Sequence, residues 1–400
     1  MLGTVFRAVL AMYVVETGAA MAQQYDPGAS ATEIRLGQTM PFSGPVSVAG
    51  AVGHASLAYF AAINKSGGIN GRQIKLLSLD DGYSPPKTVE ATRRLVEDDD
   101  VLMVYGSVGT PTNAAVERYL NLKKVPQLFI TTGASRFRDP KAFPWTIAFL
   151  PGYMAEGRAM ARYVLATVSE PRIAVLYQND DLGKDFRAGF RSGLADNANS
   201  LIVSEQTFEV ADPTVDQQMV AAKASGANVF YFAGTQKAGA EQIRARHNLG
   251  WTPLHLVCSI ASGVEGVLKP AGLDNSEGLI STAYAKDPFD PTWADDADVK
   301  TFLDWVKDNL TVGNPRDSGI VGGYIVSYLA AYVLENAGST LTRENLLNIA
   351  THLDHLSVPM LLPGITVTTT PTDYSVINRF QIQRFESGRW VPIGKTISGE

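Results

Sequence analysis

Short apolar segments of strand length alternate with segments of helix length along almost the whole chain. Strands are expected at residues 33–37, 74–79, 101–105, 125–131, 172–177, 228–232 and 254–257. Helical segments, such as residues 50–65 and 153–168, connect them. Apolar strands joined by helices are typical of parallel sheets that are covered on both faces. We therefore expect an α/β fold with doubly wound, Rossmann-like parallel sheets.

The alternation pauses three times, which indicates more than one domain. The first pause, at residues 140–153, is rich in proline and aromatic residues, and the others lie near residues 279–285 and 363–378. A chain of 400 residues is also too long for one ordinary domain. We therefore expect two α/β lobes joined by three hinge crossings, with a cleft above the hinge. Lobe 1 is expected to contain residues 33–150 and 284–377, and lobe 2 to contain residues 151–283 and 378–400.

The last part of the chain is expected to form a β-hairpin in lobe 2. Residues 379–385 alternate polar and apolar side chains, and residues 386–389 have the composition of a hairpin turn. Two long helical segments precede it, near residues 297–310 and 319–337. These helices are expected in lobe 1.

The first 22 residues have the layout of a secretory signal peptide. Arg7 precedes a short apolar core at residues 8–15, and residues 20–22 form a small-residue cleavage site. No cysteine follows that site, which argues against a lipoprotein. No stretch approaches the roughly 18 apolar residues that span a bilayer. We expect an exported, soluble protein of the periplasm that is not embedded in the membrane.

The charge balance and the single cysteine exclude several classes of protein. The chain has 34 basic and 40 acidic residues and a net charge of −6, without a long basic run, which argues against a nucleic-acid partner. Cys258 alone can form neither an intramolecular disulfide nor a thiolate metal cluster. The motifs of P-loop, dinucleotide-binding, serine-hydrolase and zinc-protease sites are missing. We expect no enzyme activity, no cofactor and no metal.

A few polar stretches have some of the chemistry of metal or acid–base sites. His352 and His355 lie with Asp354 on a probable helix but lack a recognisable third ligand. The acids at residues 295–298 lack the glycine and the terminal glutamate of an EF-hand loop. Paired acids at turns are expected to cap helices rather than to catalyse, at residues 80–81, 98–100 and 180–181.

Small and hydroxyl-bearing residues follow the third and fourth expected strands, at residues 106–113 and 131–135. Ligands of open α/β sheets bind beyond the carboxyl ends of the strands. Thr110 is a good helix N-cap and Pro111 a good first helical residue. Free backbone N–H groups and hydroxyls there predict a carboxylate site. The same residues would serve equally well as plain helix caps.

Several runs of residues resemble a known family in their order and spacing. They include LGQTMPFSGP at residues 36–45, INKSGGINGR at 63–72, TGAS at 132–135 and YQNDDLG at 177–183. These runs are similar to the branched-chain-amino-acid-type periplasmic binding proteins, the type I receptors of ABC importers. The resemblance covers roughly residues 33–390. It implies two lobes that close on one small ligand, and the membrane permease subunits of an importer as partners.

The resemblance also assigns roles to individual residues. In leucine, isoleucine and valine binders, two loops hold the ligand carboxylate, and the equivalent residues here are Ser107, Thr110, Ala134 and Ser135. Other side chains of the family are replaced in this sequence. Leu182 and Thr235 stand in place of two pocket tyrosines, and Ser259 or Ile260 stands in place of the glutamate that binds the ligand ammonium.

Two further differences concern the first loop and the family disulfide. Ala49 replaces an aromatic residue of the first loop, and Tyr83 and Gly109 replace the two disulfide cysteines.

The missing glutamate predicts the type of ligand. A buried ammonium without an acidic partner costs several kcal/mol, so we expect a carboxylate without a free α-amine, such as an aromatic or other small organic acid. An acid from elsewhere, such as Glu265 or Asp287, would restore the partner. Four tyrosines either contact the ligand or belong to the core: Tyr105, Tyr177, Tyr231 and Tyr284. The expected selectivity residues are Tyr105, Leu182, Tyr231, Thr235, Ile260 and Tyr284.

We therefore expect a periplasmic receptor that captures a small organic acid for an ABC importer of the branched-chain amino-acid transport family. One alternative is a receptor for amino acids or amides. Another is a ligand-sensing module of a signalling system. A secreted enzyme would need a nucleophile–base pair that the sequence does not reveal.

Overall fold

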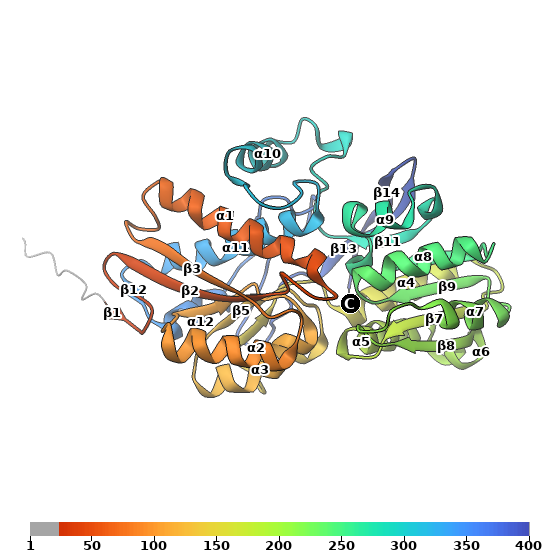
Figure 1. The fold of residues 1–400 in the computed structure, drawn as a ribbon, viewed down its shortest axis with the longest axis horizontal. Helices are drawn as coiled ribbons and strands as arrows, with labels where there is room; N and C mark the ends of the chain where they lie inside the picture. Colours follow the sequence, from red (N-terminus) through yellow and green to blue (C-terminus); the bar gives the residue numbers. More distant parts are fainter. Residues whose placement is uncertain (1–23, 400) are drawn as a thin grey trace, which may run out of the picture.

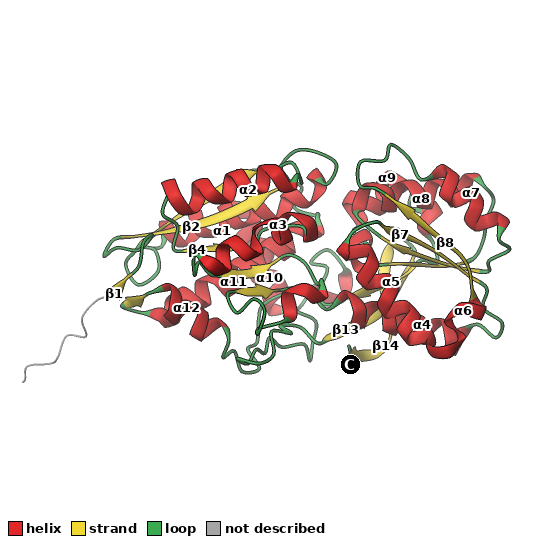
Figure 2. Ribbon diagram, turned by 90° about the horizontal axis from the view of Figure 1, so that it is seen from below, coloured by secondary structure: helices red, strands yellow, loops and turns green. Residues whose placement is uncertain are grey.

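The computed structural model describes residues 24–399 and forms two α/β lobes side by side (Figures 1 and 2). The signal peptide expected at residues 1–22 lies outside the described residues. Each lobe has one twisted sheet with helices on both faces. The chain passes between the two sheets three times: after β6, after β11 and before β13. The expected fold class, two doubly wound lobes with three crossings, is confirmed.

The sheet of lobe 1 has five parallel strands in the order β3-β2-β4-β5-β6. Its strands are β2 (Glu33–Met40), β3 (Gln73–Asp80), β4 (Met103–Tyr105), β5 (Gln127–Ile130) and β6 (Thr146–Ala148). Helices α1 (Ala51–Lys65) and α11 (Ser318–Ala337) pack together on one face. Helices α2 (Pro85–Arg93) and α3 (Thr110–Leu122) cover the other, as Figure 1 shows. Every central strand is buried, as expected for a parallel sheet.

Smaller elements complete lobe 1. Strand β1 (Gln24–Tyr25) pairs with β12 (Thr340–Leu341). Helix α12 (Arg343–Ala350) packs on α11, and α10 (Ala297–Asn309) lies beside α1. Helix α12 ends at Ala350, so the expectation that His352 and His355 lie on a helix is wrong. These two residues lie in the irregular segment that follows the helix.

The sheet of lobe 2 has seven strands in the order β14-β13-β11-β10-β9-β7-β8. They are β7 (Ile173–Gln178), β8 (Ile202–Phe208), β9 (Val229–Ala233), β10 (Leu254–Val257), β11 (Ile280–Ala283), β13 (Arg379–Glu386) and β14 (Arg389–Ser398). The last two strands form the expected hairpin and pair antiparallel with β11. The sheet is therefore mixed at this edge. The lobe boundaries given above stay a prediction.

Helices of lobe 2 connect its parallel strands. They are α4 (Tyr153–Thr167), α5 (Asp181–Leu194), α6 (Ala198–Leu201), α7 (Asp216–Ala224), α8 (Gln236–Asn248) and α9 (Lys269–Ala271). Figure 2 shows these helices around the sheet of the second lobe. Their arrangement puts the loops after β7, β9 and β10 at the edge that faces lobe 1.

Helix α11 corrects one expectation from the sequence. Its 20 residues are long and apolar enough to cross a membrane, although no such stretch was expected. In the structure 67% of its most apolar window is buried inside the fold. Because α11 packs beside α1 on one face of the sheet of lobe 1 and is mostly buried there, its apolar composition is that of a core helix.

Helices α4 and α5 approach each other unusually closely, and glycine makes this possible. A Cβ on Gly157 of α4 would lie 2.2 Å from the carbonyl oxygen of Phe186. A Cβ on Gly189 of α5 would lie 2.1 Å from the carbonyl oxygen of Met154. Since neither backbone oxygen can move without shifting a helix, only glycine fits at these positions. This contact sets the position of the start of α5 at the cleft.

We predict that Gly189→Ala lowers the free energy of unfolding by about 1–3 kcal/mol, because the added methyl overpacks the α4–α5 contact. Denaturant unfolding of the variant and the parent protein measures this. Gly322→Ala is the control: Gly322 lies in α11, and its Cβ would meet nothing nearer than Val52 at 4.0 Å. That variant should be unchanged or slightly more stable. Equal stability of Gly189→Ala and the parent would contradict the packing account.

Candidate ligand-binding site

A cleft of about 280 Å³ lies between the lobes and is lined from both sides. Lobe 1 supplies the loop before α1, the loop after β3 and the ends of β4 and β5. Lobe 2 supplies the starts of α4, α5 and α8 and the loop after β10. The side chains that line the cleft from these segments and from the end of β11 are mostly hydroxyl-bearing, aromatic or aliphatic, and we call this part of the lining the inner end of the cleft: Tyr83, Val108, Thr110, Thr131, Tyr153, Leu182, Thr235, Ser259, Ile260 and Tyr284. The cleft therefore lies where ligands of α/β sheets bind, beyond the carboxyl ends of the strands.

Five of the ten predicted site residues line this cleft. They are Thr110, Leu182, Thr235, Ile260 and Tyr284. The Thr235 hydroxyl is already engaged, since it donates to Gln178 Oε1 at 2.8 Å. The Tyr284 ring packs edge-on against Phe149, with the ring centroids 5.9 Å apart. Whether these five residues contact a ligand stays a prediction.

Two predicted selectivity residues, Tyr105 and Tyr231, lie in the core rather than on the cleft. Tyr105 is fully buried at the end of β4, and its hydroxyl lies 3.3 Å from Ser327 Oγ of α11. Tyr231 is fully buried in β9 and stacks on Phe190 of α5 at 4.5 Å. Both strands are covered by helices on both faces, so these rings fill the lobe interiors. The sequence alone had left this core alternative open.

The hydroxyl-rich loops of lobe 1 bond mainly to each other. Ser107 Oγ accepts the Thr39 backbone N–H at 3.0 Å, and Thr110 Oγ lies 2.8 Å from Thr132 Oγ. Thr132 Oγ also accepts the backbone N–H of Ala134. Ser107 and Ala134 are buried behind the cleft surface. The N-cap of α3 is Gly109, so the expectation that Thr110 caps this helix is wrong by one residue.

The Tyr83 ring packs against the start of α3. Tyr83 was not among the carboxylate donors expected from the sequence. A Cβ on Gly109 would lie 2.6 Å from the Tyr83 ring, so the two positions that correspond to the family disulfide are in contact. The Thr110 backbone amide of lobe 1 and the Gln178 side chain of lobe 2 lie against the Tyr83 hydroxyl. Burial raises the pKa of Tyr83 well above its usual range. The protonated phenol is therefore a hydrogen-bond donor at the lobe 1 end of the cleft.

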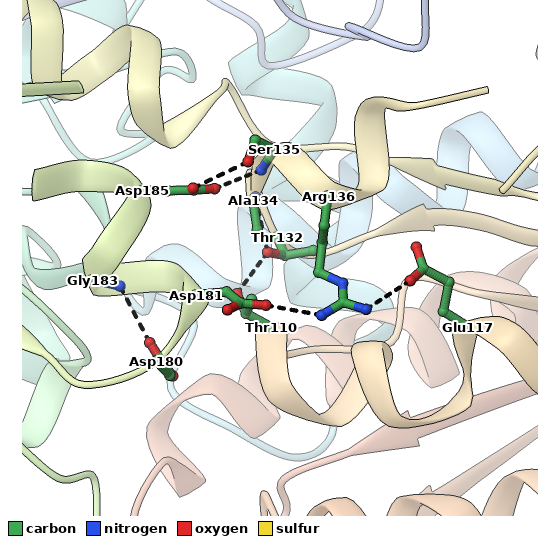
Figure 3. Close-up of polar contacts among 10 residues, drawn as sticks. All are labelled: Thr110, Glu117, Thr132, Ala134, Ser135, Arg136, Asp180, Asp181, Gly183 and Asp185. Atoms are coloured by element: carbon green, nitrogen blue, oxygen red, sulfur yellow. Dashed lines mark hydrogen bonds and ion pairs between the residues drawn. The ribbon is translucent and has the colours of Figure 1, made fainter. Parts of the chain in front are cut away.

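Ser135 lies at the rim between the lobes, and its donors are taken by a carboxylate of the protein itself. The Ser135 backbone N–H and hydroxyl both donate to the carboxylate of Asp185 in α5, at 2.6 and 3.1 Å (Figure 3). Asp185 therefore binds to this loop of lobe 1 in the way that was expected of a ligand carboxylate. A carboxylate that already fills the loop leaves Ser135 no free donor in the closed structure.

Arg136 adds a second polar contact beside the first. Its guanidinium bonds to Asp181 of α5 at 2.9 Å and to Glu117 of α3 at 3.1 Å (Figure 3). Glu117 is fully buried, and burial raises its pKa to about 7 despite the neighbouring Arg136. We call the four residues that cross between the lobes here, Ser135, Arg136, Asp181 and Asp185, the interlobe latch.

The opposite rim of the cleft is closed by apolar and polar contacts. Val48 of lobe 1 packs on the backbone of Gly266 of lobe 2, where an added Cβ would lie 2.5 Å from Val48 Cγ1. Glu265 Oε2 accepts from Asn314 at 3.1 Å. Contacts on both rims mean that the lobes are closed over the cleft.

A carboxyl group of lobe 2 lies one layer behind the cleft, and the sequence search missed it. Glu156 of α4 accepts the backbone N–H and the hydroxyl of Ser259, both at 2.7 Å. Ser259 is one of the two positions where the family carries its ammonium-binding glutamate. Burial raises the pKa of Glu156 to about 7. Nothing in the sequence around Glu156 marks it, because α4 and the loop after β10 are about a hundred residues apart.

Charged side chains line the end of the cleft that is formed by the segments after β11 and before α11, and two of them, Lys286 and Asp290, are ion-paired. Lys286 Nζ bonds to Asp296 at 2.8 Å and to Asp298 at 3.2 Å. Arg316 stacks over the Phe289 ring. Asp287, one of the two acids named from the sequence, lines this end and accepts from the Phe289 backbone N–H. The other, Glu265, is held by Lys269 and Asn314.

We predict that Asp185→Ala shifts the protein without ligand toward an open arrangement by about fivefold, because two charge-assisted hydrogen bonds across the lobes are lost. Small-angle scattering of the ligand-free protein should give a larger radius of gyration. Asp196→Ala, on the exposed turn after α5, is the control and should leave the radius unchanged. An unchanged radius for both variants would mean that the interlobe latch does not hold the lobes together.

Comparisons with known proteins agree with this architecture. The family model described as a periplasmic binding protein matches residues 33–389. A curated Leu/Ile/Val-binding protein homologue of Brucella melitensis is 26% identical over 318 residues, which cover 78% of this chain and 81% of that protein. The relatives found are binding proteins rather than enzymes.

Solved structures show the same fold at low sequence identity. A branched-chain amino acid ABC transporter protein from Thermus thermophilus with bound valine superposes with a TM-score of 0.81 at 15% identity, covering 92% of this chain and 97% of that one. A solute-binding protein from R. palustris in complex with benzoate gives a TM-score of 0.77 at 16% identity, covering 92% and 98%. Both likenesses concern the fold, since the identities are low.

Proposed function

The chain belongs to the periplasmic binding protein family, of the branched-chain amino acid ABC transporter type, and from this premise we propose that it captures a small organic acid without a free α-amine. The acid binds in the interlobe cleft, and the closed receptor delivers it to the permease of an ABC importer. The export expected from the N-terminal sequence agrees with this role in the periplasm.

The polarity of the inner cleft is the observation that carries this proposal. Hydroxyls and amide groups face it, from Tyr83, Thr110, Thr131 and Ser259, between aliphatic and aromatic walls. The acidic side chains that line the cleft, Asp287, Asp290 and Asp317, come from the segments after β11 and before α11, and none of them comes from the loops that carry Tyr83, Thr110 and Ser259. Hydrogen-bond donors at Tyr83 and at the start of α3, without an acid among them, favour an anionic or neutral polar end on the ligand and disfavour an ammonium.

The carboxylate is proposed to lie at the start of α3, against the Tyr83 hydroxyl and the Thr110 loop. The amide groups of the first helical turn and the helix dipole favour a negative charge there. Because Asp185 fills the Ser135 donors, Ala134 and Ser135 are not part of the proposed anchor. Ser135 instead helps to hold the lobes closed through the interlobe latch, whereas Ala134 is buried within lobe 1.

Closure follows from contacts that a ligand adds across the cleft. Ligand contacts to Tyr83 and Thr110 on lobe 1 and to Leu182, Thr235, Ser259 and Ile260 on lobe 2 exist together only when the lobes are closed. Such a ligand shifts the equilibrium toward the closed form by its differential affinity. The interlobe latch adds to that stabilisation and forms the joined surface that a permease would recognise.

An amino-acid receptor is a second candidate, and Glu156 is the observation that favours it. Its carboxyl group lies behind Ser259, where the family pairs a glutamate with the ligand ammonium. Both of its oxygens, however, accept bonds from Ser259. An ammonium in the cleft would therefore meet the Ser259 hydroxyl rather than the carboxylate.

A thermal-shift screen of residues 23–400 tests the proposal against this second candidate. The panel contains the 20 amino acids, benzoate and cinnamate derivatives, short fatty acids, 2-oxo acids, urea and small amides. A ligand at about 100 times its Kd adds roughly 2.7 kcal/mol to the free energy of unfolding. We expect amine-free acids to raise the Tm and leucine and valine to leave it unchanged. A shift with leucine or valine alone would replace the proposal by the amino-acid receptor.

We predict that Tyr83→Phe weakens binding of the best acid from this screen by about tenfold, because one hydrogen bond to the carboxylate is lost while the ring still covers Gly109. Isothermal titration calorimetry measures the change in Kd. Tyr177→Phe is the matched control, since the Tyr177 ring lies beside Arg187 and does not line the cleft. An unchanged Kd in Tyr83→Phe would move the carboxylate away from the start of α3.

A further inference from the structure

Glu156 is a buried acid in contact with a cleft residue, and the proposed function makes no use of it. Its side chain is 1% exposed. Both carboxylate oxygens accept from one residue, Ser259, through the backbone N–H and the hydroxyl. Ser259 lines the cleft, whereas Glu156 does not. Any effect of Glu156 on a ligand must therefore pass through Ser259.

The groups around Glu156 are polar but neutral. The hydroxyls of Ser259 and Thr282 lie against its carboxyl group. Tyr231, Cys258, Tyr153 and Tyr284 approach it from β9, from the end of β10, from α4 and from the end of β11. Burial is the main cause that raises the pKa of Tyr231, Cys258 and Tyr284, and the negative charge of Glu156 adds to it. Within residues 24–399 the structure gives Glu156 no ion pair with a lysine, arginine or histidine.

The Ser259 hydroxyl has a fixed direction because Glu156 is an acceptor. A serine hydroxyl has one proton to donate and two lone pairs with which to accept. The proton of Ser259 points to Glu156 Oε2, so the lone pairs remain for a group in the cleft. The negative charge behind the hydroxyl strengthens it as an acceptor.

We propose that Glu156 is a specificity-determining residue that acts through Ser259, and selects ligands with a hydrogen-bond donor at the lobe 2 end of the cleft. This inference rests on the proposed function, and it defines the ligand as an organic acid whose far end carries an O–H group or an uncharged N–H group such as an amide. The carboxylate meets Tyr83 and Thr110 in lobe 1, and the donor meets Ser259 Oγ in lobe 2. Such a ligand hydrogen-bonds to both lobes, so the same two contacts give selectivity and closure.

Protonation of Glu156 reverses the direction of the hydrogen bond between Glu156 and Ser259, a pair that we call the relay. A protonated carboxyl group can donate to Ser259 Oγ, and the serine proton is then free to turn toward the cleft. Because burial without a cation raises the pKa of Glu156 to about 7, both forms are present near neutral pH. The preference for a donor-bearing ligand should therefore be full above pH 7 and should fall as the pH drops through about 7.

The experiment compares acids that differ only at the end remote from the carboxylate. The probes are benzoate, 4-hydroxybenzoate and 4-(aminomethyl)benzoate, with pentanoate and 5-hydroxypentanoate as an aliphatic pair. Calorimetric titration at pH 6 and pH 8 gives the Kd of each probe for residues 23–400. At pH 8 we expect the hydroxyl-bearing acid to bind about tenfold more tightly than its partner, and we expect this ratio to shrink at pH 6. A larger gain for the aminomethyl acid would show that this end of the cleft accepts an ammonium, which would overturn both this inference and the amine-free ligand.

Three variants separate the relay from a structural role of Glu156. Glu156→Gln has nearly the same shape, and should reduce the hydroxyl preference several-fold and remove its pH dependence. Ser259→Ala should also remove the preference, whereas Ser259→Thr, which keeps a hydroxyl, should retain it. If Glu156→Gln fails to fold, the two serine variants still decide the question.

The outcomes distinguish this inference from the proposed function. If the parent protein binds the acids with no preference for a donor, or if Ser259→Ala keeps the preference, the relay is wrong and the organic-acid receptor stands. If none of the five acids binds, the proposed function fails, and the relay fails with it.

Discussion

The contact between the Asp185 carboxylate and the two donors of Ser135 is the interaction on which the closed cleft depends. It joins the hydroxyl-rich loop after β5 in lobe 1 to the first turns of α5 in lobe 2. With Arg136 and Asp181 it closes one rim, while Val48 on Gly266 closes the other. Because α5 is fixed on α4 by glycine contacts, these rim groups move only when whole lobes move. Ligand binding and lobe closure are therefore one equilibrium.

The same contact changes what the cleft can bind. A carboxylate of the protein fills one of the two loops that the family uses for the ligand carboxylate, and a tyrosine covers the start of α3 at the other. The polar groups that remain around Tyr83 and Ser259 are mostly hydroxyls, and the acids that line the cleft, Asp287, Asp290 and Asp317, come from the segments after β11 and before α11. The physical cost of burying charge then decides between ligands: an anion finds donors at the Tyr83 end, whereas an ammonium finds no cleft-lining acid on the loops that carry Tyr83 and Ser259.

The fold could be predicted from the sequence because its signals are local. The strand at 229–233, the helix at 153–167 and the C-terminal hairpin all follow from periodicity and turn residues within a few positions. Five of the residues named from the sequence line the cleft, while their contact with a ligand stays a prediction: Thr110, Leu182, Thr235, Ile260 and Tyr284. Tyr105 and Tyr231 are wrong as cleft residues because exposure depends on which helices cover a strand. Glu156 and Asp185 were missed because their partners, Ser259 and Ser135, are distant in the sequence.

The most direct test of the central claim is to identify the molecule that the receptor carries. Protein purified from its native periplasm without dialysis would be examined by native mass spectrometry, and the released ligand treated with an amine-specific reagent. The account predicts a small acid that contains a carboxyl group and does not react with the reagent. An amine-reactive ligand, such as leucine or valine, would contradict it and would show that the cleft accepts an ammonium.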